Sequence, residues 1–329
     1  MSASAEAASQ LWFAEARLQT LGAGHIHDTY LLSLPDTPQR YVLQCLNETV
    51  FRDAALVMQQ TQRLLAHWQQ QSRYQVATLQ PSLRGEIAER LESRLWRVWQ
   101  FIPASRVLEP LAVPAQAYAA GSAFGYFQSY LNHLEGPRFA DTIQGFLQLQ
   151  HYLEAFAAVA SDAPTSLRRL IDDHTDLAAR FAERNCFIHG DCKVNNLLFA
   201  AESDDVLAII DFDTAMYGHW AWDFGDLMRS ICHSRGHVEL EIFSACLRGF
   251  AAEQRQANAA DCVAAPAYVA LMLGVRFLTD HLQDDVYFKV DRRGDNLTRA
   301  RQQFSLFEDL LDQRDAMLRA ADEVFEALT

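Results

Sequence analysis

The spacing of hydrophobic residues changes near residue 115, and this change limits what each part of the chain can fold into. Before that point, short apolar runs alternate with polar residues at every second position, which is typical of strands. One longer segment has apolar residues at helical spacing and begins at Asp53, a residue type that caps helix N-termini well. We expect strands at residues 17–21, 29–34, 41–46, 74–79 and 95–102, and a helix at residues 53–70.

After residue 115 the apolar residues recur at three- and four-residue spacing over long segments, which predicts helices. Helices are expected at residues 114–132, 142–159, 165–184, 267–282 and 297–326, and short inserted strands at residues 186–188, 197–199 and 206–210. Prolines at positions 103, 110 and 114 mark a connector. The sequence therefore predicts an α+β protein with a sheet-rich N-terminal lobe, residues 1–102, and a larger, mainly helical C-terminal lobe, residues 103–329.

The charge of the chain bears on its partners. The formal net charge is −14, and no run of Lys or Arg is present. Nucleic-acid binding needs clustered positive charge on the phosphate backbone, so we exclude it. An acidic surface fits neutral or cationic small molecules better, although a pocket can differ from the average surface.

The sequence also indicates a compartment. Residues 1–13 lack the basic and apolar regions of a signal peptide. The longest apolar stretch, at residues 267–278, is too short to span a bilayer and contains Arg276. The six cysteines show no disulfide spacing. We expect a cytoplasmic protein with reduced thiols and no membrane partner; the oligomeric state stays open.

The segment that carries chemistry is FIHGDCKVNNLLF, residues 187–199, which is followed by an apolar strand that ends at Asp211. Phosphoryl transfer needs a group that accepts the hydroxyl proton and hard oxygen ligands for magnesium. Asp191 supplies a carboxylate for the first task, and Asn196 and Asp211 supply oxygens for the second. A loop between two short strands places Asp191 and Asn196 close together, and the next hairpin brings Asp211 opposite them.

Two other interpretations fit parts of this segment. His-Gly-Asp alone fits an ordinary turn with a buried histidine and a capping aspartate. Cys186, His189 and Cys192 also have the spacing of half a zinc site, but a fourth ligand is not evident and the cysteines fit a strand core. The joint pattern H-G-D-x-x-x-x-N with a following strand that ends in Asp favours catalysis over both.

HGDCKVNN followed by IIDFD resembles the aminoglycoside phosphotransferase and choline kinase superfamily. The resemblance implies a protein-kinase-like two-lobed fold with a small antiparallel-sheet N-lobe, and ATP and Mg²⁺ as co-substrate and cofactor. It assigns Asp191 as catalytic base and Asn196 and Asp211 as metal ligands. His189 then supports the loop and Lys193 approaches the transferred phosphate. The segment Asp223-Phe-Gly spells a kinase metal motif, but it lies at a helix start, where the superfamily has a structural aspartate.

Asp213 keeps three interpretations: a contact to the substrate, a ligand of a second metal, or a residue that orients the site. A finer resemblance links the chain to bacterial N-acetylhexosamine 1-kinases, which phosphorylate the anomeric hydroxyl. It is carried by GAGHIHDTY at residues 22–30, YVLQCLN at 41–47 with VFRD at 50–53, and RFLTDHLQDDVYFK at 276–289. By that resemblance Arg276 and Tyr287 face the sugar, together with His25. Taken alone, Arg276 fits a surface ion pair and Tyr287 a core aromatic.

The nucleotide site departs from the kinase pattern. The only lysines are Lys193 and Lys289, so the third strand has no lysine for the phosphates and carries Gln44 instead. Gln44 matches the hexosamine kinase branch, whereas the next residue, a cysteine, replaces its arginine. Without charge assistance the Gln44 contact is weaker, and Arg40 is a possible substitute cation.

The remaining candidate contacts to the nucleotide follow from their positions in the chain. Gly22 and Gly24 expose backbone N–H groups to phosphate or simply form a hairpin. The connector residues Gln100, Phe101 and Ile102 lie where kinases offer backbone groups to adenine.

The leading hypothesis is thus an ATP-dependent sugar 1-kinase with a small-molecule substrate. A second keeps the chemistry with choline, ethanolamine, homoserine or an aminoglycoside as acceptor. The acidic composition fits it, and Trp220 and Trp222 could offer cation-binding rings, although an interpretation as core residues is favoured for both. A third is a catalytically weak nucleotide-binding regulatory module, suggested by the missing lysine. A glycosidase that uses Asp211 and Asp213 fits poorly, because no second carboxylate faces them across a bond to be cleaved.

Overall fold

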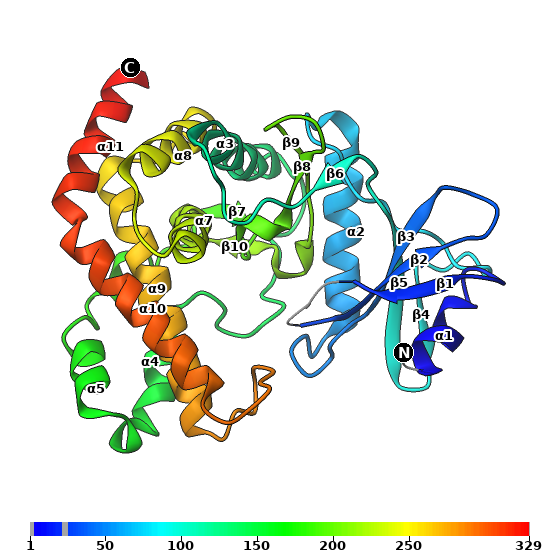
Figure 1. The fold of residues 1–329 in the computed structure, drawn as a ribbon, viewed down its shortest axis with the longest axis horizontal. Helices are drawn as coiled ribbons and strands as arrows, with labels where there is room; N and C mark the ends of the chain where they lie inside the picture. Colours follow the sequence, from blue (N-terminus) through cyan, green and yellow to red (C-terminus); the bar gives the residue numbers. More distant parts are fainter. Residues whose placement is uncertain (1–2, 22–25, 329) are drawn as a thin grey trace. The chain divides into compact units, whose positions relative to one another are not determined.

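The computed structural model describes residues 3–21 and 26–328. The chain forms two compact units, Met1–Ser105 and Arg106–Thr329 (Figure 1). The predicted contacts Gly22, Gly24 and His25 lie outside the described residues.

The N-terminal unit is built on a five-stranded antiparallel sheet with strand order β1-β2-β3-β5-β4 (Figure 1). Its elements are α1 (Ala3–Ser9), β1 (Arg17–Thr20), β2 (Asp28–Ser33), β3 (Arg40–Cys45), α2 (Ala54–Gln71), β4 (Ala88–Leu91) and β5 (Arg94–Gln100). As predicted, Asp53 caps α2, and its carboxylate accepts a hydrogen bond from the Leu56 N–H at 2.9 Å.

The alternation of β3 sets the two faces of this sheet. Tyr41, Leu43 and Cys45 are buried in one hydrophobic cluster together with α1. Gln44 therefore points to the opposite face. The register of β3 and β5 places Gln44 directly across from Arg97, so these two side chains come together.

Two elements of this unit differ from the sequence prediction. The strand predicted at residues 74–79 is wrong, because the segment makes only isolated bridges, at Gln75 and between Leu79 and Trp99. The short strand β4 was not predicted, since its charged residues break the apolar alternation. One of them, Glu89, is buried and bound by Ser82 and Arg84.

The C-terminal unit is mainly helical, with four short paired strands and a further strand at its start (Figure 1). Its helices are α3 (Pro114–Leu131), α4 (Leu149–Ala157), α5 (Thr165–Asp172), α6 (Leu177–Arg180), α7 (Trp220–Arg235), α8 (Leu240–Glu253), α9 (Ala259–Leu282), α10 (Asp295–Asp312) and α11 (Arg314–Leu328). Its strands are β7 (Cys186–Ile188), β8 (Leu197–Ala200), β9 (Val206–Ile209) and β10 (Met216–Gly218), and β6 (Ser105–Arg106) lies at the boundary of the units.

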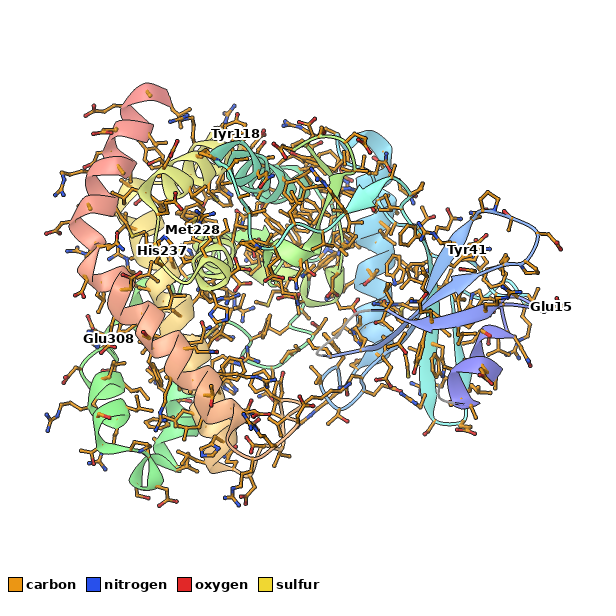
Figure 2. All side chains as sticks on the ribbon, in the orientation of Figure 1. Glu15, Tyr41, Tyr118, Met228, His237 and Glu308 are labelled. Atoms are coloured by element: carbon orange, nitrogen blue, oxygen red, sulfur yellow. The ribbon has the colours of Figure 1, made fainter. Side chains whose placement is uncertain are left out.

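The core of this unit lies between α7, α8, α9 and the helices packed on them, α3, α10 and α11. Met228 of α7 is buried there, whereas Glu308 of α10 lies at the surface (Figure 2). Trp220 and Trp222 are also buried, which confirms the interpretation as core residues rather than cation-binding rings. Among the described residues, α9 alone is long and apolar enough to cross a membrane, but 78% of its most apolar window is buried within the protein, as in the core helix of a globular unit.

Several predicted helices have different limits. The one expected at residues 142–159 begins only at Leu149, after Leu147 in a left-handed conformation. The one expected at 165–184 is broken into α5 and α6, and the one at 297–326 into α10 and α11. In these cases apolar spacing continues across a break, because both helices bury residues in the same core.

All six cysteines are free and buried. Burial raises the pKa of each thiol, to about 12 for Cys186 and Cys232.

Candidate active site

The predicted catalytic segment forms the loop from β7 to β8. β7 pairs with β10, and β8 pairs with β9 in a hairpin that sets Leu197 opposite Ile209. The N–H of Ile210 donates to the carbonyl of Asn196 at 3.0 Å. Asp211 follows directly, so the hairpin brings it next to the residue pair Asp191 and Asn196, as its sequence position predicted.

Three side chains converge in this loop. The Lys193 Nζ lies 2.7 Å from Oδ2 of Asp191. The Asn196 Nδ2 donates to the same Oδ2 at 2.9 Å and to the Asp191 carbonyl at 2.8 Å. No described residue donates a hydrogen bond to Oδ1 of Asp191 or to Oδ1 of Asn196. Both oxygens therefore remain able to bind a ligand or a proton.

The charges in the loop are coupled. Burial by itself raises the pKa of Asp191, but the Lys193 ammonium and the Asn196 amide outweigh it and hold that pKa below its usual value. Burial likewise lowers the pKa of Lys193, and the carboxylates of Asp191 and Asp211 outweigh it, so that pKa is raised. At neutral pH the site holds a carboxylate and an ammonium in contact.

His189 supports the loop from beneath. Its Nδ1 accepts from the Asp191 N–H at 3.3 Å, so the proton of the neutral ring lies on Nε2, which donates to the Ile210 carbonyl at 3.0 Å. The ring packs against Phe124 and Phe127. His189 thus links the loop to the end of β9.

Gly190 is required by close packing as well as by its backbone. Its φ is +82°, and a Cβ there would lie 2.6 Å from the carbonyl oxygen of Thr214. The Thr214 hydroxyl in turn donates to the His189 carbonyl at 3.0 Å. The loop can approach Thr214 only because position 190 has no side chain.

Asp223 of α7 braces the loop, as predicted. Its carboxylate accepts from the N–H groups of His189 and Gly190 at 2.8 and 2.9 Å and is fully buried. Gln128 of α3 adds a third donor at 2.9 Å, and Gln254 donates to the oxygen of Gln128 at 2.7 Å. Burial raises the pKa of Asp223 above its usual value, although the Gln128 amide and the N–H groups of His189 and Gly190 act to lower it.

The amide pair Gln128 and Gln254 was missed by the sequence reasoning. Each is a single polar residue within or beside an apolar helix pattern, which is a weak signal. The bonds join residues 95 and 126 positions apart, and only the fold brings them together.

Asp211 and Asp213 flank a tight turn after β9. Asp211 has φ 70° and ψ 67°, a left-handed conformation that non-glycine residues adopt mostly at functional sites and tight turns. Asp213 is only 2% exposed, and its carbonyl accepts from the Thr142 hydroxyl at 2.7 Å. This bond ties the segment before α4 to the turn.

Arg276 of α9 lies among four aromatic rings. Its guanidinium carbon is 5.4, 4.8, 5.6 and 5.2 Å from the ring centroids of Phe146, Tyr152, Tyr287 and Phe288, respectively. We call these four rings the aromatic box. Tyr287 is 43% exposed, so the aromatic box opens to solvent on the side of this ring. Within the described chain, no carboxylate pairs with Arg276, contrary to the surface ion pair considered above.

The sheet of the N-terminal unit holds Gln44 in a defined orientation. Its Oε1 accepts from Nε and Nη2 of Arg97 at 3.1 and 3.0 Å and from the Trp99 indole at 2.7 Å. The amide Nε2 is left as a donor with no acceptor among the described residues. Arg97, 1% exposed, was missed by the sequence reasoning, which named Arg40; that residue instead covers the Phe101 ring at 4.0 Å.

Two of the three connector residues use their backbone N–H groups in hydrogen bonds within the protein. The N–H groups of Gln100 and Phe101 donate to Thr78 and Arg40 carbonyls at 2.8 and 3.0 Å. The N–H of Ile102 has no acceptor in the described part of the chain. Of the three predicted adenine contacts, Ile102 is thus the one with a backbone donor to offer.

Comparison with known proteins agrees with this geometry. The model of the phosphotransferase enzyme family matches residues 17–270. The chain belongs to this family. It is an ATP-dependent phosphotransferase with an alcohol group as acceptor.

Solved structures share the fold at low identity. Amicoumacin kinase hAmiN, in complex with AMP-PNP, Ca²⁺ and Ami, is 15% identical with a TM-score of 0.66 over 92% of each chain. A microcompartment-associated aminopropanol kinase is 18% identical with a TM-score of 0.67 over 94% of this chain and 97% of that one. A choline/ethanolamine kinase family protein from Mesorhizobium loti is 17% identical with a TM-score of 0.62 over 96% and 98%. The predicted α+β, protein-kinase-like fold is confirmed.

Proposed function

We propose that this phosphotransferase transfers the γ-phosphoryl of ATP to the anomeric hydroxyl of an N-acetylhexosamine in the cytoplasm. The family and the reaction class are given by the match over residues 17–270. The acceptor rests on the box around Arg276 and on the resemblance of residues 276–289 to N-acetylhexosamine 1-kinases.

In the proposed reaction Asp191 acts as the base. Its Oδ1 takes the proton of the acceptor hydroxyl while that oxygen bonds to the γ-phosphorus and the bond from the γ-phosphorus to the β–γ bridging oxygen breaks, leaving ADP. Lys193 keeps Asp191 ionised and offsets negative charge that develops on the phosphoryl group. His189 and Asp223 hold the loop that carries both.

The oxygens of the loop fit a magnesium ion. Asn196 uses both amide hydrogens of Nδ2 to orient itself on Asp191, which leaves Oδ1 as a hard ligand, and Asp211 supplies a carboxylate. ATP and Mg²⁺ serve as co-substrate and cofactor, and the amicoumacin kinase structure holds AMP-PNP and Ca²⁺. When bound, the ion neutralises phosphate charge.

The phosphates have no lysine partner in the sheet. We assign Gln44 Nε2 as a donor to them, since Arg97 and Trp99 fix its oxygen on the other side. A guanidinium bound to the amide oxygen polarises the amide and strengthens its N–H as a donor. Ile102 N–H is the corresponding candidate for adenine, with Gln100 and Phe101 as its supports; Gly22 and Gly24 remain candidates for the phosphates.

Arg276 is the single observation that carries the acceptor class. A guanidinium already fills the ring-walled space in which a quaternary or primary ammonium would otherwise bind. Its N–H groups can donate to sugar hydroxyl or acetamido oxygens, and the half-exposed Tyr287 offers a ring face and a hydroxyl. Asp213 and His25 are further candidates for sugar contacts.

A cationic acceptor remains the second candidate. The aminopropanol kinase and the choline/ethanolamine kinase family protein share the fold, and the chain carries a net charge of −14. The positive charge of Arg276 opposes such an acceptor at the aromatic box.

The test is ADP formation with Mg-ATP against N-acetylglucosamine, N-acetylgalactosamine, other hexoses, aminopropanol, choline, ethanolamine, homoserine and kanamycin. Phosphorylation at the anomeric carbon also removes the reducing end of the sugar, which a reducing-sugar assay detects. Asp191→Asn should abolish turnover, whereas Glu202→Gln, an exposed carboxylate of the β8–β9 turn, should not. Turnover with an N-acetylhexosamine and loss of its reducing end support the proposal; turnover only with an amine-bearing acceptor refutes the sugar.

A further inference from the structure

The segment between α9 and α10 supplies two of the four rings around Arg276, Tyr287 and Phe288. It leaves α9 through two successive left-handed residues, Asp284 and Asp285, with φ of 66° and 59°. Two adjacent non-glycine residues in this conformation are strained and persist only where surrounding contacts fix them. The Asp285 N–H donates to the Asp280 carbonyl at 2.8 Å and closes the turn, and side chains hold the residues that follow it.

Asp280 provides that hold. It lies one helical turn after Arg276 on α9, and it is 5% exposed. Its Oδ1 accepts from the Tyr287 N–H at 2.7 Å, and its Oδ2 accepts from the Phe288 N–H at 2.9 Å. One buried carboxylate thus fixes both ring-bearing residues through their backbone.

Asn296 of α10 completes the arrangement. Its Nδ2 donates to Oδ2 of Asp280 and to Oδ1 of Asp285, both at 2.8 Å, and the side chain is fully buried. The strained turn, the ring-bearing segment and α10 are joined through this amide. The Phe288 ring also packs on the Phe277 ring of α9, with centroids 4.5 Å apart, so it contacts two successive side chains of that helix, Arg276 and Phe277.

We propose that Asp280 is a positioning residue of the acceptor site, which acts through Tyr287 and Phe288 to hold the Arg276 guanidinium in one orientation. Arg has many rotamers, and a box of rings reduces the entropy that the side chain loses when it binds an acceptor. The inference rests on the proposed function, since Arg276 must contact the acceptor for its orientation to matter. Asp280 is assigned no contact to the acceptor, because it is buried and both of its carboxylate oxygens accept hydrogen bonds from within the protein.

The experiment compares Asp280→Asn with Asp295→Asn. The first keeps the size of the side chain but turns one oxygen into a donor that faces a backbone N–H. The second removes a carboxylate that also accepts backbone N–H groups of the same segment, from Asp291 and Arg292, away from the rings. Steady-state kinetics are measured for acceptor and ATP, and hydrogen exchange is followed over residues 283–294.

Asp280→Asn should raise KM for the acceptor about tenfold, the scale of one lost charge-assisted hydrogen bond, while KM for ATP changes less than about twofold. The amides of Tyr287 and Phe288 should exchange faster. Asp295→Asn should leave both KM values unchanged. Phe288→Leu keeps the backbone bonds and should also raise KM for the acceptor, so it decides the question if Asp280→Asn does not fold.

Arg276→Lys separates this inference from the function on which it rests. If Arg276→Lys raises KM for the acceptor but a folded Asp280→Asn does not, Asp280 has no positioning role and the proposed function stands. If Arg276→Lys leaves that KM unchanged, Arg276 does not contact the acceptor and the inference fails together with that part of the proposal.

Discussion

Replacing Gln44 by Lys restores the residue that kinases normally carry on the third strand, and we expect it to destabilise this protein. The reason is Arg97, whose guanidinium lies 3.0 Å from the Gln44 oxygen and is 1% exposed. Two positive charges about 4 Å apart repel by about 4 kcal/mol at an effective dielectric constant of about 20. The ammonium can move partly into solvent, because position 44 is only half-buried. The free energy of unfolding at pH 7 should therefore fall by about 2–4 kcal/mol, a large part of the 5–15 kcal/mol of a typical domain.

The stability of Gln44→Lys should depend on pH, and the direction of this dependence follows from the pKa of the new lysine. Repulsion by Arg97 and partial burial both lower the pKa of a lysine at position 44 in the folded state below its unfolded value. The folded state then binds fewer protons than the unfolded state, so stability rises with pH. The deficit of Gln44→Lys should be largest near neutral pH and shrink toward pH 10.

Urea unfolding at several pH values measures this deficit. Gln39→Lys, at an exposed position of the turn before β3, is the matched control and should change stability by less than about 0.5 kcal/mol. The double variant Gln44→Lys/Arg97→Glu places an opposite pair across the same register and should recover stability relative to Gln44→Lys alone. A Gln44→Lys protein as stable as the parent at pH 7, with no dependence on pH, would refute the reasoning.

Three further predictions concern the catalytic loop. Lys193→Met removes the ammonium that holds the pKa of Asp191 down, so the acid limb of the kcat/KM profile should move to higher pH; an unmoved limb contradicts the coupling. Gln128→Leu leaves a buried carboxylate of α7 short of one donor and should lower the free energy of unfolding by about 1–3 kcal/mol in urea titrations, together with a lower kcat. Gly190→Ala places a Cβ 2.6 Å from a backbone carbonyl oxygen and should reduce kcat at least about tenfold, whereas Gly236→Ala, with the same φ of +82° but open space around it, should leave kcat unchanged.

The catalytic loop could be predicted because its geometry is local. Asp191 and Asn196 are five residues apart on one loop, and the pairing of two adjacent strands brings Asp211 to them. Residue type and spacing were sufficient for this arrangement. The supporting role of Asp223 also followed from its place at the start of a helix.

What the sequence could not predict depends on contacts between distant residues. An arginine in an alternating strand looks like an exposed residue, yet the register of β3 and β5 buries Arg97 against Gln44. In the sequence, Asp280 is one polar residue in an amphipathic helix pattern. Only the fold shows that its carboxylate accepts hydrogen bonds from two backbone N–H groups of the segment between α9 and α10. The break between α10 and α11 could not be predicted either, because the apolar residues keep their helical spacing across it.

Because all six cysteines are buried, the number of thiols that react with a reagent reports which of the two units has opened. Cys45 belongs to Met1–Ser105, and the other five thiols belong to Arg106–Thr329. A thiol reagent reacts with the thiolate, which burial suppresses at all six positions, so labelling requires that a unit opens. Intact-mass spectra after a labelling pulse would then show one adduct when the N-terminal unit opens alone, five when the C-terminal unit opens alone, and six when both unfold. The native sequence thus carries its own reporter of which unit loosens first, and of which one bound nucleotide or acceptor protects.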